Sequence, residues 1–151
     1  IHFMGTYYCT HLLLPHMRKH ERADIQIISS RQADYFPPNS VPYNVAKSAQ
    51  NAFAKTLAKE ERYNGIRVNA ISPGFVETDM SRDAIQHMTG LSNLREVDNR
   101  MPLGRIIQPE DIGNLCTYLA SPEGSHISGE VMNVRGAVGQ EPPIYYFSEQ
   151  K

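Results

Sequence analysis

The stretch IQIISSRQADYFPPNSVPYNVAKSAQNAFAKTLAKEERYNGIRVNAISPG, Ile25 to Gly74, decides the fold. Its first six residues form a short apolar run that ends in two serines, which predicts a buried strand over 25–30. A polar loop with prolines follows over 31–42. An alanine-rich helix is predicted over 43–63, with an apolar stripe at four-residue spacing: Val45, Ala49, Phe53 and Leu57. Asn64-Gly65 ends that helix, and a second strand is predicted over 66–71. A strand, helix and strand in this order favour a parallel sheet.

The pair Tyr43 and Lys47 is the strongest chemical signal in this stretch. Residues four apart lie one turn apart on the same face of a helix. An ammonium group there stabilises a phenolate, which makes a phenol a usable proton donor and acceptor near neutral pH. Ser30, thirteen positions upstream, can deliver a hydroxyl to the same substrate carbonyl, and Ser29 is the alternative. The spacing by itself is weak evidence, so the rest of the chain has to support it.

Motifs further along the chain supply that support. They are Asn69-Ala-Ile-Ser-Pro-Gly74 with Thr78, Pro102-Leu-Gly-Arg105, Gln108-Pro-Glu-Asp-Ile-Gly113, Ile127-Ser-Gly129 and Val134-Arg-Gly136. Together with Ser30, Tyr43 and Lys47, they make the chain resemble the short-chain dehydrogenase/reductase family from Gly5 to about Ala137. The last motif departs from the family pattern, because Arg135 stands where the family usually has an acidic residue.

The resemblance implies an α/β, Rossmann-like doubly wound parallel sheet, of which residues 1–151 are the C-terminal catalytic portion: three strands with flanking helices. A helix is expected over residues 1–20, another from Pro109, and a third strand over 130–134. Residues 75–108 are expected to form a substrate lid, with Met80, Ala84 and Met88 on one helical face. Residues 138–151 are expected to form a C-terminal arm.

Four residues carry catalytic expectations from the resemblance. Tyr43 is the general acid in carbonyl reduction and the base in alcohol oxidation, and Ser30 binds the substrate oxygen. Lys47 favours the ionised phenol and bonds the hydroxyls of the nicotinamide ribose. His2 falls where the family often has an asparagine that holds a water in a proton relay. A histidine can also hold a water or carry a proton, or His2 can lie outside the relay as an ordinary helix residue.

The cofactor expectations concern the end of the second strand. Besides Tyr43 and Lys47, the resemblance assigns cofactor contacts to Pro73, Gly74, Val76 and Thr78: the backbone near Val76 meets the nicotinamide carboxamide, and Thr78 supplies a hydroxyl. The cofactor is NAD or NADP, and the sequence does not choose between them. Asn69 is expected to brace the strand rather than touch a ligand.

The phosphate-binding, glycine-rich turn of a doubly wound fold is not found in the sequence. We therefore expect about a hundred further residues upstream in a complete member of the family. Residues 1–151 alone are expected to be inactive and poorly soluble, since one sheet edge would expose unpaired backbone.

Composition excludes several other classes of protein. The net charge is −1, so nucleic acid is not an expected partner. No apolar run reaches about 18 residues, so no membrane span is expected. Cys9 and Cys116 form no C-x-x-C pair, which favours a reducing, cytoplasmic location. His16 and His20 have a helical metal-ligand spacing but no evident third ligand, so no metal site is expected.

The sequence therefore predicts an NAD(P)-dependent oxidoreductase that interconverts an alcohol and a ketone. Two rivals stay open: a non-catalytic truncated paralogue that acts through its oligomerisation helices, and an epimerase or dehydratase that uses the same Tyr/Lys pair. By the resemblance, the helices over 3–20 and 43–62 form the interface of a homodimer or homotetramer.

Overall fold

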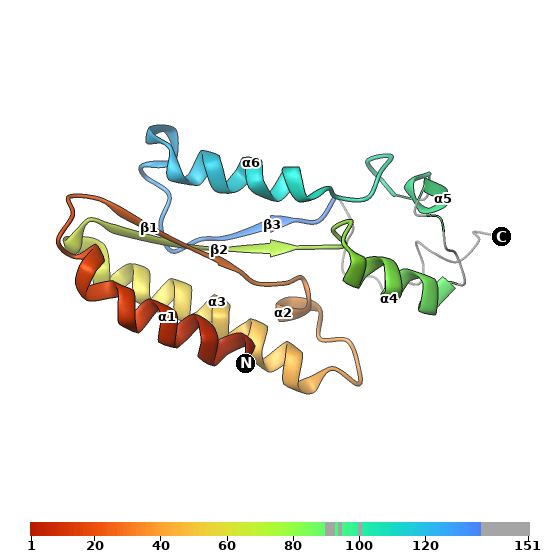
Figure 1. Ribbon diagram of the computed structural model, residues 1–151, viewed down its shortest axis with the longest axis horizontal. Coiled ribbons are helices and arrows are strands. Elements are labelled where there is room, and N and C mark those ends of the chain that lie inside the picture. Colours follow the sequence, from red (N-terminus) through yellow and green to blue (C-terminus); the bar gives the residue numbers. More distant parts are fainter. Residues whose placement is uncertain (90–92, 94, 100, 137–151) are drawn as a thin grey trace.

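Three parallel strands form the centre of the protein, in the order β1-β2-β3 (Figure 1). They are β1 (Ala23–Ile28), β2 (Ile66–Pro73) and β3 (Val131–Val134). This computed structural model describes residues 1–89, 93, 95–99 and 101–136. The expected C-terminal arm over 138–151 lies outside the described residues.

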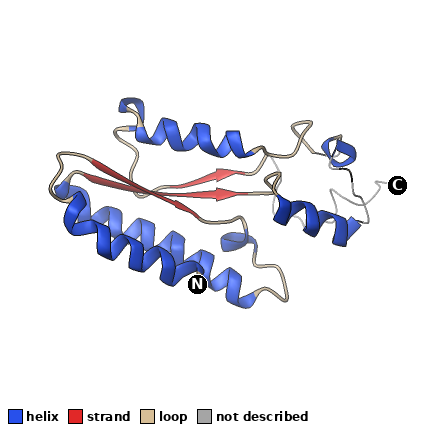
Figure 2. Cartoon of the chain, viewed as in Figure 1, coloured by secondary structure: helices blue, strands red, loops and turns tan. Residues whose placement is uncertain are grey.

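Helices cover both faces of the sheet (Figure 2). Helices α1 (His2–Met17) and α3 (Val41–Glu61) lie side by side on one face, and α6 (Pro109–Ala120) lies on the other (Figure 1). The remaining helical elements are α2 (Gln32–Tyr35), η1 (Arg62–Asn64), α4 (Asp79–Thr89), α5 (Arg95–Asp98) and η2 (Pro122–Gly124). The predicted order of helices and strands is confirmed, with the short helix α2 as an addition. Among the helices of the described residues, none has both the length and the apolar character needed to cross a lipid bilayer.

Strand β2 is central because it pairs on both sides. It pairs with β1 from Ala23↔Ile66 to Ile28↔Ile71, and with β3 from Ala70↔Val131 to Pro73↔Val134. Its apolar side chains pack with Ala54, Leu57 and Ala58 of α3, and with Ile27 of β1, in the main core. All three strands run in the same direction, so their carboxyl ends meet at one edge of the sheet.

The buried face of α3 differs from the predicted apolar stripe. Val45, a member of that stripe, is 63% exposed. The buried positions toward the start of the helix are polar instead: Asn44, Lys47 and Gln50. Burying polar groups is tolerated only when they are hydrogen-bonded, and each of these donates to a backbone carbonyl. The start of α3 is therefore built around polar contacts and its middle around the apolar core.

Several element boundaries also differ from the predicted ones. Strand β1 ends at Ile28, so the two serines follow the strand rather than ending it. Helix α3 begins at Val41, because Pro42 fits the first turn of a helix, where no N–H partner is needed. Helix α1 runs through Pro15 and ends at Met17, so His20 lies beyond its end. In the described part of the chain no three potential metal ligands gather.

Candidate active site

The carboxyl end of β1 presents two serines to different surroundings. Ser29 is buried, and its hydroxyl donates to the backbone carbonyl of Lys47 at 3.2 Å. Ser30 is half-buried and lines a cleft, and its Oγ accepts the backbone N–H of Gln32 at 3.2 Å. A hydrogen bond from the start of α2 thus orients Ser30, while the hydrogen bond of Ser29 connects the end of β1 with α3.

Tyr43 and Lys47 project from the first turns of α3 beneath that strand end. Lys47 is only 7% exposed, and its Nζ donates to the carbonyl of Ile28 at 2.8 Å. The same Nζ lies 5.7 Å from the centre of the Tyr43 ring. Burial lowers the pKa of the Lys47 ammonium, because desolvation disfavours its charged form. The contacts hold one positive charge next to the phenol.

His2 meets Tyr43 from the first turn of α1. The two rings are 5.3 Å apart between centroids and lie edge to face, with 81° between their planes. Gln50 fixes this end of α1, because its Nε2 donates to the carbonyl of His2 at 3.0 Å and to the hydroxyl of Thr6 at 2.7 Å. His2, which the resemblance places at the family's asparagine position, therefore lies against the phenol ring.

The turn after β2 comes close to its neighbours. The N–H of Gly74 donates to the carbonyl of Val134 at 2.8 Å, and a Cβ on Gly74 would lie 3.4 Å from the Arg135 Cα. Val76 forms an isolated parallel bridge with Ile107. A side chain at position 74 would therefore contact Arg135 and Ile107 at once.

A cleft of about 580 Å³ brings most of the predicted site residues together. That volume is in the range of small-molecule sites. Its lining consists of Ser30, Gln32, Asn39, Ser40, Pro42, Tyr43, Gly74, Phe75, Val76, Thr78, Met80, Ser81 and Ala84. Pro73, Lys47 and His2 do not line it: Pro73 is buried at the end of β2, Lys47 is buried under the strand end, and His2 flanks Tyr43.

The expected lid segment is packed by its own small core. Ile85 of α4, Val97 of α5 and Ile106 are fully buried against one another, with Phe75 and Met101 beside them. Met80 is 78% exposed and lines the cleft together with Ala84, so these two members of the predicted helical face border the same space. The side chain of Met88, its third member, lies outside the described residues.

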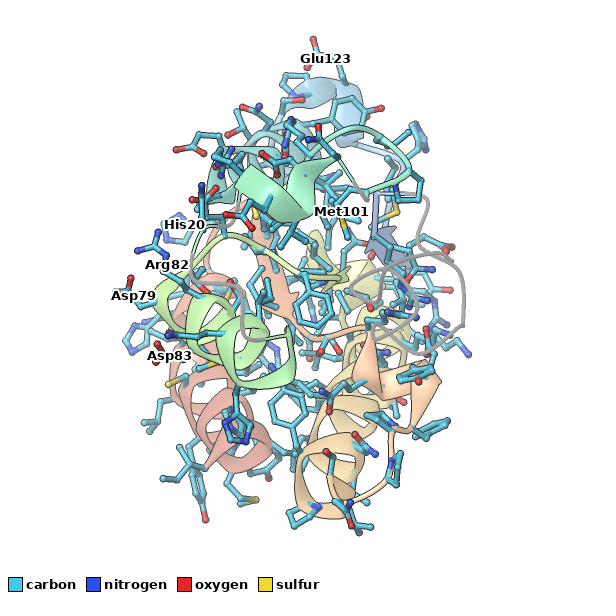
Figure 3. The ribbon with its side chains drawn as sticks, turned by 90° about the vertical axis from the view of Figure 1, so that its right-hand side faces the viewer. His20, Asp79, Arg82, Asp83, Met101 and Glu123 are labelled. Carbon is cyan, nitrogen blue, oxygen red and sulfur yellow. The ribbon has the colours of Figure 1, made fainter. Side chains whose placement is uncertain are left out.

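The carboxylate of Glu77 connects this segment to its surroundings through a hydrogen bond and ion pairs. Its carboxylate accepts from Gln108 Nε2 at 2.8 Å, forms an ion pair with Arg95, and lies 3.6 Å from Arg82. The amide of Gln108 and the guanidinium of Arg95 lower the pKa of this carboxyl. Arg82 lies with Asp79 on the outer side of α4 (Figure 3). Glu77 therefore connects α4 and α5 to the turn after β2.

Arg135, the departure from the family motif, has specific partners. Its Nη2 donates to Asp34 of α2 at 2.5 Å and to the hydroxyl of Ser72 at 3.1 Å. One guanidinium thus connects the ends of β2 and β3 with the helix that follows Ser30. Asn69 braces the sheet as expected, because its amide bonds the carbonyl of Ile127 at 2.8 Å and the N–H of Glu130 at 3.1 Å.

Ser81 is a site residue that the sequence analysis missed. It is 9% exposed, lines the cleft, and bonds to the segment that precedes α4. The available signal was the spacing of Thr78 and Ser81, since two hydroxyl residues three apart before a helix resemble a capping box. Asn39, which has a positive φ of 61°, was missed as well.

The fold and this edge of the sheet define a protein of the doubly wound, Rossmann-like class. Residues 1–137 match the family model described as enoyl-(acyl carrier protein) reductase. The chain belongs to the short-chain dehydrogenase/reductase family. The relatives of this chain that belong to the family are oxidoreductases.

Three relatives show the breadth of that family. The 3-oxoacyl-[acyl-carrier-protein] reductase FabG of Thermotoga maritima is 33% identical over 91% of this chain and 54% of its own length. The ligand-free aldohexose dehydrogenase of Thermoplasma acidophilum superposes with a TM-score of 0.83, at 27% identity over 95% of this chain and 58% of the other. A 7α-hydroxysteroid dehydrogenase complexed with NADH and a 7-oxo bile acid superposes with a TM-score of 0.80, at 28% identity over 93% and 54%. The chain spans about half the length of the curated relatives it matches.

Proposed function

We propose that the whole protein is an NAD(P)-dependent oxidoreductase that interconverts an alcohol and a ketone. The observation that carries the proposal is the cleft shared by Ser30 and Tyr43, with the buried ammonium of Lys47 beside the phenol. A proton donor, a hydroxyl for the substrate oxygen and a fixed positive charge are the groups that carbonyl reduction requires.

Each residue has a defined task in the proposed reaction. In the reducing direction Tyr43 donates a proton to the substrate oxygen, and Ser30 donates a hydrogen bond to that oxygen. Lys47 stabilises the negative charge left on the phenol. His2, which lies beside the Tyr43 ring, takes part in the proton relay that supplies protons to the site. In the oxidising direction the same phenol oxygen accepts the proton.

The turn after β2 suits a nicotinamide cofactor, because Gly74 and Val76 line the cleft and Thr78 supplies a hydroxyl there. Pro73, Gly74, Val76, Thr78, Tyr43 and Lys47 are the residues that would hold it. When bound, the cofactor supplies or accepts the hydride. Whether it is NAD or NADP, and which substrate is used, stay open, since the relatives named above act on an acyl thioester, a sugar and a steroid.

The test combines a mass with an activity. We expect the mass of the natural polypeptide to exceed 17.0 kDa by that of about a hundred residues. We also expect it to oxidise NADH or NADPH in the presence of a ketone from one of these three classes. A natural mass of 17.0 kDa without binding of either cofactor would refute the proposal.

A second observation favours assembly into a homodimer or homotetramer. Met4, Tyr8 and Leu12 follow one another at four-residue spacing on α1 and are 43%, 56% and 70% exposed, and Val45 on α3 is 63% exposed. Contiguous apolar side chains on a surface mark an interaction site. Light scattering on the natural protein checks this: Tyr8→Glu with Leu12→Glu is expected to yield smaller particles than the wild type. The non-catalytic rival predicts the same assembly but no cofactor binding.

A further inference from the structure

The hydroxyl of Ser81 is the centre of a small hydrogen-bond network beside the cleft. Its Oγ accepts the backbone N–H of Thr78 at 3.0 Å. Its proton is shared between two carbonyl oxygens, that of Val76 at 2.5 Å and that of Thr78 at 2.9 Å. A serine hydroxyl has one donor and two acceptor positions, so these contacts use its proton and one lone pair.

The network also includes the side chain of Thr78. Its Oγ1 accepts the N–H of Ser81 at 3.3 Å and lies 3.4 Å from the Ser81 hydroxyl. This is the reciprocal arrangement that closes the start of a helix, here α4. The direction in which the Thr78 hydroxyl points is therefore coupled to Ser81.

The segment over 76–78 is also held by backbone contacts to Ile107 and by the carboxylate of Glu77, which bonds Gln108 and pairs with Arg95. Val76 bridges Ile107, and the N–H of Glu77 donates to the carbonyl of Ile107 at 2.8 Å. Without the Ser81 hydroxyl, the carbonyl of Val76 and the N–H of Thr78 lose a hydrogen-bond partner, and both residues line the cleft. The contacts of Glu77 do not involve these two groups, so losing the Ser81 hydroxyl would let them and the Thr78 hydroxyl shift.

We propose that Ser81 is a positioning residue that orients Val76 and Thr78 toward the carboxamide of the nicotinamide. This inference rests on the function proposed above. A carboxamide carries one acceptor and one donor group in fixed directions, so its recognition depends on how well the protein groups are aligned. Ser81 does not touch the cofactor; it acts through the two residues it bonds.

The experiment compares two ligands that differ only in the nicotinamide. The dissociation constants of the reduced dinucleotide and of ADP-ribose, or its 2′-phosphate for an NADP enzyme, are measured by calorimetry on the natural polypeptide. In Ser81→Ala we expect the dissociation constant of the dinucleotide to rise about tenfold and that of the ADP-ribose compound to stay within about twofold. Ser81→Thr, which keeps the hydroxyl, is expected to bind both ligands as the wild type does.

A matched control removes a hydroxyl from another helix end. Ser121 closes the end of α6, where its Oγ donates to the carbonyl of Tyr118 at 2.8 Å. Ser121→Ala is expected to leave both dissociation constants unchanged. Should Ser81→Ala fail to fold, Ser81→Cys keeps the shape with a weaker donor and acceptor, and the same selective loss is expected to a smaller degree.

The possible outcomes separate the inference from the proposed function. Equal losses for the dinucleotide and the ADP-ribose compound, or no loss for either, overturn the role of Ser81. A wild-type protein that binds neither ligand overturns the proposed function instead. A selective loss of dinucleotide binding that Ser81→Thr does not show supports both.

Discussion

Replacing Lys47 by methionine separates the charge of this residue from its packing. Methionine retains a straight side chain of similar length, so the buried stem of Lys47 is largely reproduced while the ammonium is removed. The Nζ lies 5.7 Å from the Tyr43 ring centre, and at an effective dielectric constant of 20 a unit charge at that distance contributes about 3 kcal/mol. If this charge stabilises the developing phenolate, the turnover number is expected to fall about 100-fold.

The same substitution is expected to change stability little. It removes the hydrogen bond to Ile28, which costs about 1 kcal/mol. It also relieves the burial of an ammonium group, since burial lowers the pKa of Lys47. The two effects oppose each other, so the free energy of unfolding at pH 7 should stay within about 1 kcal/mol of the wild type.

The slope of stability against pH tests the burial of the Lys47 ammonium independently of turnover. Between the lowered pKa of folded Lys47 and the unfolded value of about 10.4, the folded state binds fewer protons than the unfolded state. The free energy of unfolding of the wild type should therefore rise with pH in that window. The Lys47→Met variant lacks this contribution, so the free energy of unfolding of the wild type should increase relative to that of the variant as pH rises.

The assays are steady-state hydride transfer and urea unfolding over a series of pH values, both on the natural polypeptide. Lys55→Met is the matched control, because Lys55 lies on the same helix and is exposed. A Lys47→Met variant with turnover within threefold of the wild type would refute the proposed charge stabilisation. So would an equal loss of turnover in the Lys55 control.

Four further substitutions, in three experiments, test other parts of the protein. Tyr43→Phe is expected to lower turnover about 1000-fold and to change the dissociation constant of the cofactor little, because the proton-transferring oxygen is removed while the ring and the other cofactor-binding residues are kept; stopped-flow absorbance and cofactor fluorescence measure the two. The Arg105 guanidinium lowers the pKa of Asp111 to about 2, so its contribution to stability should be present above pH 4 and lost as pH falls toward 2. Asp111→Ala should lose about 1 kcal/mol at pH 7 and show a flatter acid limb in urea unfolding, and an unchanged limb would contradict this. Arg135→Met and Asp34→Asn should be coupled by about 0.5–1 kcal/mol in a double-mutant cycle, whereas additive effects would show that this pair does not hold α2.

The sequence was sufficient to predict the elements that repeat a strong pattern. The apolar runs before Ser29 and before Pro73 predicted two strands that are present, and the turn at Asn64-Gly65 ends the intervening helix as predicted. Gly65 has a φ of +68°, and a Cβ there would lie 2.3 Å from the Glu21 carbonyl oxygen. Such a position admits glycine almost alone, which is why it is legible in a sequence.

The errors arose where tertiary contacts outweighed local pattern. Periodicity of apolar residues placed Val45 in the buried face of α3, but that face is polar near the site because Asn44 and Lys47 have backbone partners from other segments. Helix α2 was not predicted, because four residues are too few to show a helical period. Its position depends on contacts such as Ser48 donating to the carbonyl of Ala33 at 3.0 Å, which no local pattern encodes.

Lys47 and Ser29 have hydrogen-bond partners within this chain, whereas the outer edge of β1 pairs with no strand among the described residues. Lys47 is held by Ile28, and Ser29 is held by Lys47. Among the described residues, β1 pairs with β2 alone, and a cleft of about 500 Å³ separates its outer side from α1, with Leu13 and Ile25 in the lining. An uncovered strand edge with apolar side chains is prone to pairing with another strand. We therefore expect the geometry around Tyr43 to be set by contacts between α3 and β1, and solubility to depend on what covers the outer edge of β1.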